Sequence, residues 1–285
     1  MSSVELSRIV QVRTGGSPPV FSTRSLELEA LAEQASPLLV FDDFRVSAPI
    51  FPPHPHAGFS AVTYVFPDSR GALRSRDSLG NDAVVGPGSV VWTTAGSGVI
   101  HEETPAEAGR ELHGLQLFVN LSARNKLMPP RSDRLSGNEV PEWRGTGGDR
   151  VRVVVGSFKN VSSPLIPPEP FVLLDVDLRQ EISFELPAGH NGLVYVARGT
   201  VEVDSGRREQ RLEASQGIGL RGSGRTSFRA TNPAHLVLLA GMELREPVVA
   251  EGPFIMNDRA QVQAAVVRYQ SGAMGRLSPA SRNEP

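Results

Sequence analysis

Two short pairs of residues in this sequence could together bind a metal ion. His54 and His56 are separated by one residue in FPPHPHAGF, and His101 and Glu103 are separated by one residue in GVIHEETP. In a β-strand, residues i and i+2 point to the same side, so each pair would direct two donor atoms toward one point. Two neighbouring strands would then form a four-ligand site. The alternative is two pairs of surface side chains that never meet.

Three neutral imidazoles and one carboxylate form a ligand set that suits Fe, Mn, Co, Ni, Cu or Zn. Such a set leaves coordination positions open for water or a substrate. The sequence contains no cysteine, which excludes disulfides, thiolate ligands and a cysteine nucleophile. If the protein senses redox state, a metal must therefore carry that function.

The strands that position these residues belong to a predicted all-β fold. The 28 glycines and 23 prolines separate short runs rich in Val, Leu, Ile and Phe, such as FSAVTYVFP and FVLLDVDL. Short apolar runs between turn residues are typical of a β-sandwich or β-barrel. Both halves of the chain follow the order strand, tight turn, strand, Gly-containing turn, strand. This repetition predicts a duplicated barrel.

We predict an N-terminal metal-binding barrel over residues 1–130, a linker over 131–150, and a C-terminal barrel without a metal over 151–285. The linker is predicted because that stretch is polar and contains Pro141 and a Gly-Thr-Gly-Gly run. A short helix is predicted over 24–34. An amphipathic helix of about four turns is predicted near the C-terminus, with Asn257 as its N-cap. Its apolar residues at helical spacing are Val262, Ala265, Val266 and Tyr269.

Charge and hydropathy exclude some classes of protein. The formal net charge is −2, which argues against direct nucleic-acid binding. Acidic residues are interleaved with the arginines of the second half, so a solvated sheet face is expected there; these arginines are Arg207, Arg208, Arg211, Arg221, Arg225 and Arg229. No apolar run approaches the ~18–20 residues that cross a bilayer, and the start MSSVELSRIVQV lacks the apolar core of a signal peptide. We therefore expect a cytoplasmic protein that does not associate with a membrane.

Four segments of the sequence resemble the pirin family of bicupins. They are FPPHPHAGFSAVTY, GSVVWTTAGSGVIHEETP, LHGLQLFVNL and AGMELREPVVAEGPFIMN, and they occur in order from about Phe41 to Gly275. The resemblance implies two cupin-type barrels with a short C-terminal helix, an all-β fold. It also implies that the N-terminal barrel holds iron, Fe(II) or Fe(III), through His54, His56, His101 and Glu103. Zn, Mn, Ni, Co and Cu remain alternative metals.

The sequence also departs from the family pattern. Ala57 stands where many members have Arg, Ser75 where a His is common, and Pro67-Asp68 occupies a turn that usually contains Gly. None of these residues is a predicted ligand, so they are expected to border the cavity mouth or to lie behind the ligands. They leave the substrate-binding residues unknown.

The remaining histidines and the flanking aromatic residues have more ordinary interpretations. His113, His190 and His235 each lack an HxH partner and are predicted to be structural. The aromatic residues that flank the ligands either line an apolar pocket or pack in the barrel core; they are Phe51, Phe59 and Trp92.

The resemblance implies two functions from different classes. One is an iron-dependent dioxygenase of the quercetin 2,3-dioxygenase type, which uses O2 and a small aromatic substrate of flavonol or catechol type. Glu103 would then be a catalytic residue that accepts the substrate hydroxyl proton as general base. The alternative is a non-catalytic, iron-dependent redox-sensing regulator that binds a protein partner. A metal-stabilised scaffold without catalysis is a third option.

Overall fold

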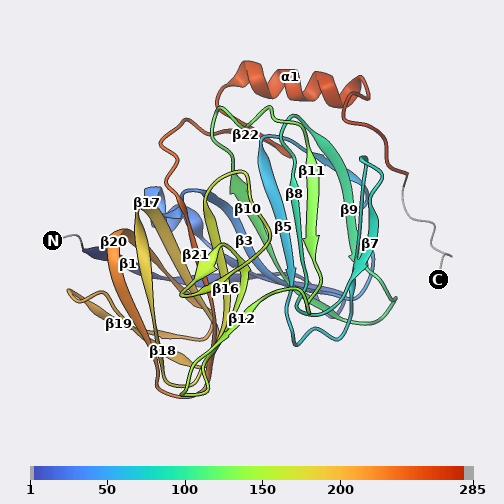
Figure 1. Cartoon of the computed structure of the whole chain (residues 1–285). Coiled ribbons are helices and arrows are strands. Elements are labelled where there is room, and N and C mark those ends of the chain that lie inside the picture. Colours follow the sequence, from blue (N-terminus) through green and yellow to red (C-terminus); the bar gives the residue numbers. More distant parts are fainter. Residues whose placement is uncertain (1–2, 279–285) are drawn as a thin grey trace. The chain divides into compact units, whose positions relative to one another are not determined.

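The chain folds mainly into β-strands. The computed structural model describes residues 3–278, and Figure 1 shows strands along most of this range and one α-helix close to its end. The prediction of an all-β fold with a C-terminal helix is therefore confirmed. Within the described residues, no helix is long and apolar enough to cross a membrane.

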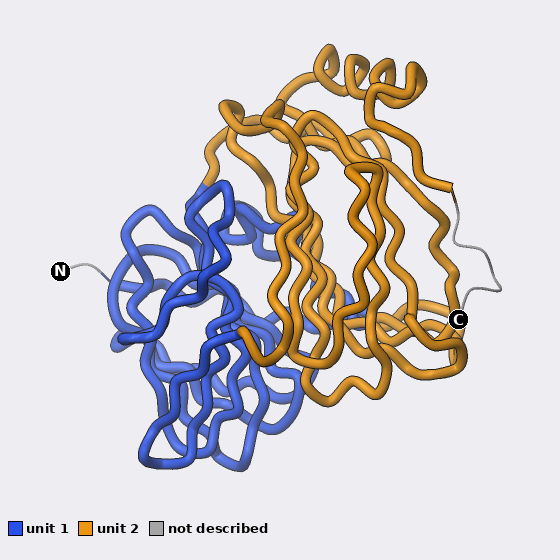
Figure 2. Tube along the Cα trace, turned by 45° about the vertical axis from the view of Figure 1, so that its right-hand side comes forward, with its two compact units in different colours: residues 1–13, 24–39, 140–243 blue, residues 14–23, 40–139, 244–285 orange. Residues whose placement is uncertain are grey.

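The chain forms two compact units that interleave along the sequence (Figure 2). Of the described residues, unit 1 contains 3–13, 24–39 and 140–243, and unit 2 contains 14–23, 40–139 and 244–278. The barrels predicted over 1–130 and 151–285 were each one continuous stretch of chain. In the structure, N-terminal residues belong partly to unit 1, and the residues after 243 belong to unit 2. Strands β1 (Val4–Ser17), β2 (Phe21–Leu26) and β3 (Leu38–Val46) each contribute residues to both units.

Unit 2 contains two antiparallel sheets and a hairpin. The first sheet has the order β11 (Arg131–Leu135), β8 (Val90–Thr94), β5 (Phe59–Val65), β10 (Leu112–Asn120), β3. The second has the order β4 (His54–His56), β9 (Val99–Pro105), β6 (Leu73–Asp77), β7 (Asp82–Val85). The hairpin pairs β22 (Val249–Glu251) with β23 (Phe254–Met256). Every residue of β5 is buried, so both faces of this strand are covered.

Unit 1 is built on one antiparallel sheet. Its order is β20 (Gln216–Ala230), β17 (Glu181–Arg198), β21 (Ala234–Met242), β16 (Phe171–Leu178), β13 (Arg150–Val155), β12 (Glu142–Arg144). β18 (Thr200–Asp204) pairs with β20 and with β19 (Glu209–Glu213), and β14 (Ser157–Phe158) pairs with β15 (Val161–Ser162). Aliphatic and Phe side chains from these strands form one continuous core. Burial of this apolar surface is the main term that stabilises the unit.

The segment predicted as a linker is partly strand. β11 pairs with β8 in unit 2, and β12 pairs with β13 in unit 1. The polar composition of residues 131–150 reflects strands that are only half-buried, because most of their side chains are intermediate or exposed.

The short helix predicted over 24–34 forms, but it begins later and is a 3₁₀ helix. Residues up to Leu26 belong to β2, and a 3₁₀ helix η1 follows at Leu28–Ala35. Leu28 and Leu31, three residues apart, are buried, as the 3₁₀ period requires. A φ of 48° at Ala32 interrupts the helix, so a continuous α-helix cannot form there.

Helix α1 (Arg259–Gln270) begins one residue later than predicted, and it has three turns rather than four. Asp258, not Asn257, is the N-cap, and its carboxylate accepts a hydrogen bond from the backbone N–H of Gln261 at 2.8 Å. Both residue types are good N-caps, so sequence alone could not choose between them. The helix buries Val262 and Ala265 in a cluster of unit 2 residues, so it belongs with unit 2 rather than with the C-terminal barrel.

Candidate metal centre

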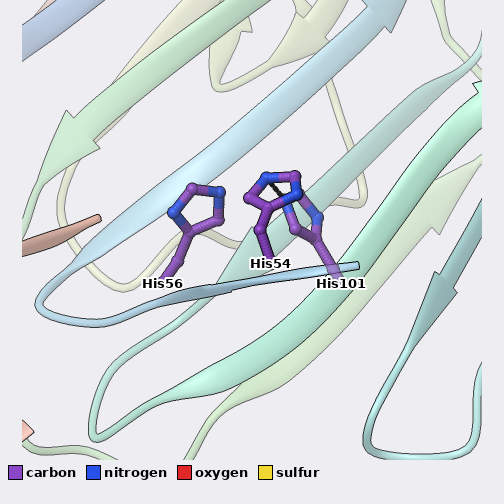
Figure 3. A group of neighbouring side chains, drawn as sticks. All are labelled: His54, His56 and His101. Carbon is purple, nitrogen blue, oxygen red and sulfur yellow. Dashed lines mark hydrogen bonds between the residues drawn. The ribbon is translucent and has the colours of Figure 1, made fainter. Parts of the chain in front are cut away.

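Antiparallel pairing of β4 with β9 brings three predicted ligands together. His54 lies directly opposite His101, and His56 lies opposite Val99. Because residues i and i+2 share a face, the rings of His54, His56 and His101 all project to the same side (Figure 3). The alternative of two histidine pairs that never meet is therefore excluded.

The three imidazoles form a compact cluster. Each offers one ring nitrogen, and these nitrogens all lie within 4.8 Å of one another. The Nε2 atoms of His54 and His101 are 3.2 Å apart. Each pair of ring centroids is separated by 4.7 Å. A small ion held between the rings would satisfy all three nitrogens at once.

Hydrogen bonding prepares at least one of these rings for a metal. The Nδ1–H of His54 donates to the carbonyl of Pro52 at 2.9 Å, so in the neutral ring the Nε2 lone pair is free. The Nδ1 atom of His101 has no hydrogen-bond partner within residues 3–278. The other nitrogen of this ring, His101 Nε2, is the one that faces the cluster, 3.2 Å from His54 Nε2.

Burial keeps two of the histidines neutral. It lowers the pKa of His56 to about 3, with a further contribution from His54, and the carbonyl of Pro253 acts in the opposite direction. Burial also lowers the pKa of His101 well below its usual value. Neutral imidazoles bind metal without first losing a proton, so the site fits a transition metal at neutral pH.

Glu103 lies beside this cluster but outside it. Its carboxylate is not among the donor atoms that fall within 4.8 Å of one another, so its role as a ligand stays a prediction. Glu103 is two residues beyond His101 on β9 and lies opposite Ser75 of β6. The neighbouring Glu102 faces away from the cluster and accepts a hydrogen bond from Arg76 at 2.9 Å.

The Glu103 carboxyl is held by two hydroxyl groups. Burial raises its pKa to about 7, while hydrogen bonds from Thr63 and Ser75 oppose the rise. One face of the side chain remains accessible from a cavity, although the group lies deep in the barrel. A cation bound nearby would lower this pKa and keep the carboxylate ionised.

Thr63 links Glu103 to Gln116. The Thr63 hydroxyl lies 2.5 Å from Glu103 Oε2 and 2.8 Å from Gln116 Oε1. A hydroxyl has one proton, so it can donate to only one of these oxygens. The second contact requires either a protonated Glu103 or a Gln116 amide turned to present its NH2 group. The sequence did not identify Thr63 or Gln116. A strand that is buried on both faces, such as β5, shows no alternation of apolar and polar residues that would reveal which side chains point toward the site.

A cavity of about 110 Å³ borders Glu103. Its walls are mainly apolar and aromatic, with Glu103 and Gln116 among the polar groups; the lining residues are Phe21, Thr23, Asp42, Phe44, Val46, Phe51, Leu73, Glu103 and Gln116. The Phe51 side chain is 46% exposed and meets Phe21 edge to face, with 5.3 Å between ring centroids. Of the three aromatic residues that flank the ligands, Phe51 therefore lines a pocket.

Trp92 and Phe59, in contrast, are buried in the barrel. The Phe59 ring also packs against His56, with 5.0 Å between ring centroids. Phe59 therefore packs against a predicted ligand, whereas Trp92 is part of the barrel core.

A buried lysine ties the HPHAG segment to the C-terminal segment. The Lys126 ammonium donates to the carbonyls of Gly58 (2.9 Å) and Ile255 (3.1 Å) and to Asn120 Oδ1 (2.6 Å). Burial lowers the pKa of Lys126 to about 8. At Gly58, where φ is +86°, a Cβ atom would lie 1.9 Å from the Ile255 carbonyl oxygen, so only glycine permits this approach. No sequence pattern had marked Lys126.

Two of the departures from the family pattern, Ser75 and Ala57, lie beside the predicted ligands, whereas Asp68 lies beyond the end of β5 that is far from His56. Ser75 hydrogen-bonds Glu103. Ala57 exchanges backbone hydrogen bonds with the C-terminal segment, donating to the Pro253 carbonyl and accepting from the Ile255 N–H. Asp68, in the turn after β5, lies 2.7 Å from His113 Nδ1.

The other three histidines each contact protein groups away from the cluster. His113 is buried between Asp43 (3.0 Å) and Asp68. His190 is held only locally, its Nδ1–H donating to the Ala188 carbonyl at 3.2 Å. His235 bonds to Asp175, which the adjacent strand β16 brings to it.

The predicted solvated arginine face is confirmed. Arg221 forms ion pairs with Glu33 and Glu243, and Arg229 pairs with Glu181 and Glu202. Arg207, Arg208, Arg211 and Arg225 are exposed. Acidic partners already neutralise part of this face, which argues against a nucleic-acid patch.

A chain with two β-barrel units, one of which turns three clustered histidines inward beside a carboxylate, is a bicupin with a candidate metal site. The Pirin family model matches residues 24–119, and the model of the Pirin C-terminal cupin domain matches residues 172–275. The chain belongs to the pirin family.

Known proteins extend this similarity along the chain. A Pseudomonas aeruginosa protein provisionally named quercetin 2,3-dioxygenase is 35% identical over 255 residues, 85% of this chain and 88% of that protein. Human pirin is 32% identical over 244 residues, 84% of this chain and 83% of its own length. The crystal structure of a quercetin 2,3-dioxygenase from Acinetobacter baumannii superposes with a TM-score of 0.83 at 26% identity, covering 96% of this chain and 99% of that one.

Proposed function

We propose that this protein is a metal-dependent dioxygenase that acts on flavonol or catechol-type substrates, with iron as its metal. The observation that carries the proposal is the position of Glu103. This carboxylate follows His101 on β9 and also lines the aromatic cavity. One residue therefore borders both the histidine cluster and the space available to a substrate.

The residues divide into two roles under this proposal. His54, His56 and His101 hold the metal, and Glu103 completes the ligand set and accepts the hydroxyl proton of the substrate. When bound, the metal supplies electrophilic activation of the substrate oxygens and of O2. Beside a bound cation the Glu103 carboxyl is ionised, and an ionised carboxylate that lines the cavity can accept a proton from a substrate hydroxyl. The names of the Pseudomonas and Acinetobacter relatives support the reaction class.

Oxygen uptake by iron-loaded protein tests this function. Quercetin and a single-ring catechol are each supplied, and at least one should be consumed with O2. Glu103→Gln keeps the size of the side chain but removes its basicity, so turnover should fall by about 10²–10⁴-fold. Metal content is measured in the same samples by mass spectrometry, because Glu103→Gln can also weaken metal binding. Metal-free protein should be inactive and recover activity with Fe(II).

Absence of turnover with either substrate at full iron occupancy would contradict the proposal. That result would favour the alternative function, a regulator that binds a protein partner. A different resident metal in freshly purified protein would correct the choice of iron without affecting the three-histidine site.

A further inference from the structure

We propose that the substrate enters the cavity as a terminal 1,2-dihydroxyphenyl ring, and that Phe21 and Phe51 exclude the central chelating ring of a flavonol. This inference rests on the proposed function and narrows its substrate class. It is carried by the size of the cavity, by its aromatic mouth and by the position of its polar groups.

The size of the cavity limits what can reach Glu103. Pockets that enclose drug-sized ligands begin at about 300 Å³. The cavity here has about 110 Å³, roughly a third of that volume. A single aromatic ring with its hydroxyl groups is the part of a larger ligand that this space can hold.

The shapes of a flavonol and of a catechol also favour the catechol in a small cavity. In a flavonol, the adjacent hydroxyl and carbonyl oxygens lie on the middle ring, between a fused ring on one side and a phenyl ring on the other. Those oxygens reach a carboxylate only in a wide cavity. In a catechol the two hydroxyl groups are at the end of the ring, so the molecule can enter end-on through a narrow mouth.

The cavity walls match a planar aromatic ring. Phe44 belongs to β3, Phe21 lies at the start of β2, and Phe51 precedes β4. Aromatic rings prefer edge-to-face or offset contacts with one another, and these three provide such surfaces. Phe21 and Phe51 touch each other edge to face, which narrows the space between the segments that carry them.

The polar part of the lining matches the two hydroxyl groups. The Glu103 carboxylate can accept a hydrogen bond from one hydroxyl, and the Gln116 side chain can hydrogen-bond the other. Thr63 fixes both side chains through its contacts of 2.5 and 2.8 Å. In the reaction both atoms of O2 are added to the ring as one carbon–carbon bond breaks, so no further reductant is required.

A binding experiment separates this inference from the proposed function. Protein loaded with Zn(II), which is redox-inert, is titrated with 4-nitrocatechol and, separately, with 3-hydroxyflavone, which lacks a terminal catechol. Changes in ligand absorbance report binding without turnover. Wild-type protein should bind 4-nitrocatechol at least tenfold more tightly than 3-hydroxyflavone.

Variants of the mouth identify its role. Phe21→Ala and Phe51→Ala each remove an aromatic contact and widen the entrance. The lost contact should weaken 4-nitrocatechol binding. The wider entrance should reduce the preference for 4-nitrocatechol over 3-hydroxyflavone at least threefold. Ile50→Ala is the matched control, because Ile50 is an exposed apolar neighbour of Phe51 that does not line the cavity. It should leave both affinities unchanged.

Equal or tighter binding of 3-hydroxyflavone by the wild type would overturn the inference, and so would binding of neither ligand. An effect of Ile50→Ala as large as that of Phe51→Ala would also overturn it. The proposed function fails by a separate observation, the absence of oxygen uptake at full iron occupancy.

Discussion

His54 and His101 are direct partners in the pairing of β4 with β9, and their Nε2 atoms lie 3.2 Å apart. Because Nδ1–H of His54 is committed to Pro52, the His54 Nε2 lone pair points at His101. Two nitrogens this close need a proton or a cation between them. Strand register therefore places two ligands at one point before any metal binds.

Replacing His56 by Ala should remove most of the bound metal while the protein stays folded, because most of the core lies elsewhere. Loss of a residue that hydrogen-bonds a metal ligand typically lowers metal affinity by about 10–100-fold, and loss of a ligand itself should lower it further. Mass spectrometry of purified protein measures metal per chain. His190→Ala is the control, since His190 has only a local backbone contact. Full occupancy in the His56 variant would contradict the assignment.

Gly58→Ala should destabilise unit 2 more than Gly80→Ala does. Both glycines have positive φ values, +86° and +93°, so both substitutions impose a similar backbone cost. Only at Gly58 does the added Cβ meet a backbone atom, the Ile255 carbonyl oxygen at 1.9 Å, whereas nothing lies within 4 Å at Gly80. Chemical denaturation and metal content of the two variants provide the comparison, and equal losses would show that the approach of Gly58 to Ile255 is unimportant.

Lys126→Met should reduce stability and metal affinity together. The substitution leaves the carbonyls of Gly58 and Ile255 buried without the Lys126 donor, at a cost of about 1–3 kcal/mol for each unsatisfied group. The loosened segment carries His54 and His56. Lys159→Met is the matched control, because Lys159 is exposed in unit 1 and packs over Trp143. Thermal unfolding with and without added metal measures both effects; unchanged metal affinity in the Lys126 variant would contradict a link to the site.

His113 should make stability depend on pH. Burial lowers the pKa of its imidazole, but the carboxylates of Asp43 and Asp68 outweigh burial and raise it above the usual value. A raised folded-state pKa contributes stability that is fully present below about pH 6.5 and is lost as pH rises through the folded pKa. The stability advantage of wild type over His113→Gln should therefore shrink with rising pH, by at most about 1.4 kcal/mol per pH unit. Urea denaturation at several pH values, with a chelator present throughout, measures it; a constant difference would count against the charge pair.

The sequence was sufficient to predict the histidine cluster because its signal is local. An HxH pair in a strand fixes the direction of both side chains, and the second pair on β9 needed only the correct register with β4. The carboxylate was harder to place, since the position of Glu103 depends on contacts with Thr63 and Ser75 from two other strands. No spacing rule within one strand contains that information.

Other features depended on pairings between distant residues. The contact of His235 with Asp175 joins residues 60 apart in sequence, and Lys126 reaches a carbonyl 129 residues away. Apolar patterning predicted the strands of both barrels but not the exchange of chain segments between units. Nothing in the local sequence of residues 14–23 and 244–278 indicates that they pack in unit 2.

The interleaving of the two units means that unit 2 is completed by a segment synthesised after residues 140–243 of unit 1. Residues 253–256, which hold Ala57 and accept a hydrogen bond from Lys126, are translated after all of residues 140–243 of unit 1. Domains generally form in order as the chain leaves the ribosome. In this chain, the unit that contains His54, His56 and His101 also includes residues 253–256, which are synthesised after residues 140–243 of the other unit. A translation product that ends within unit 1 would therefore carry His54, His56 and His101 without the segment that supports Ala57.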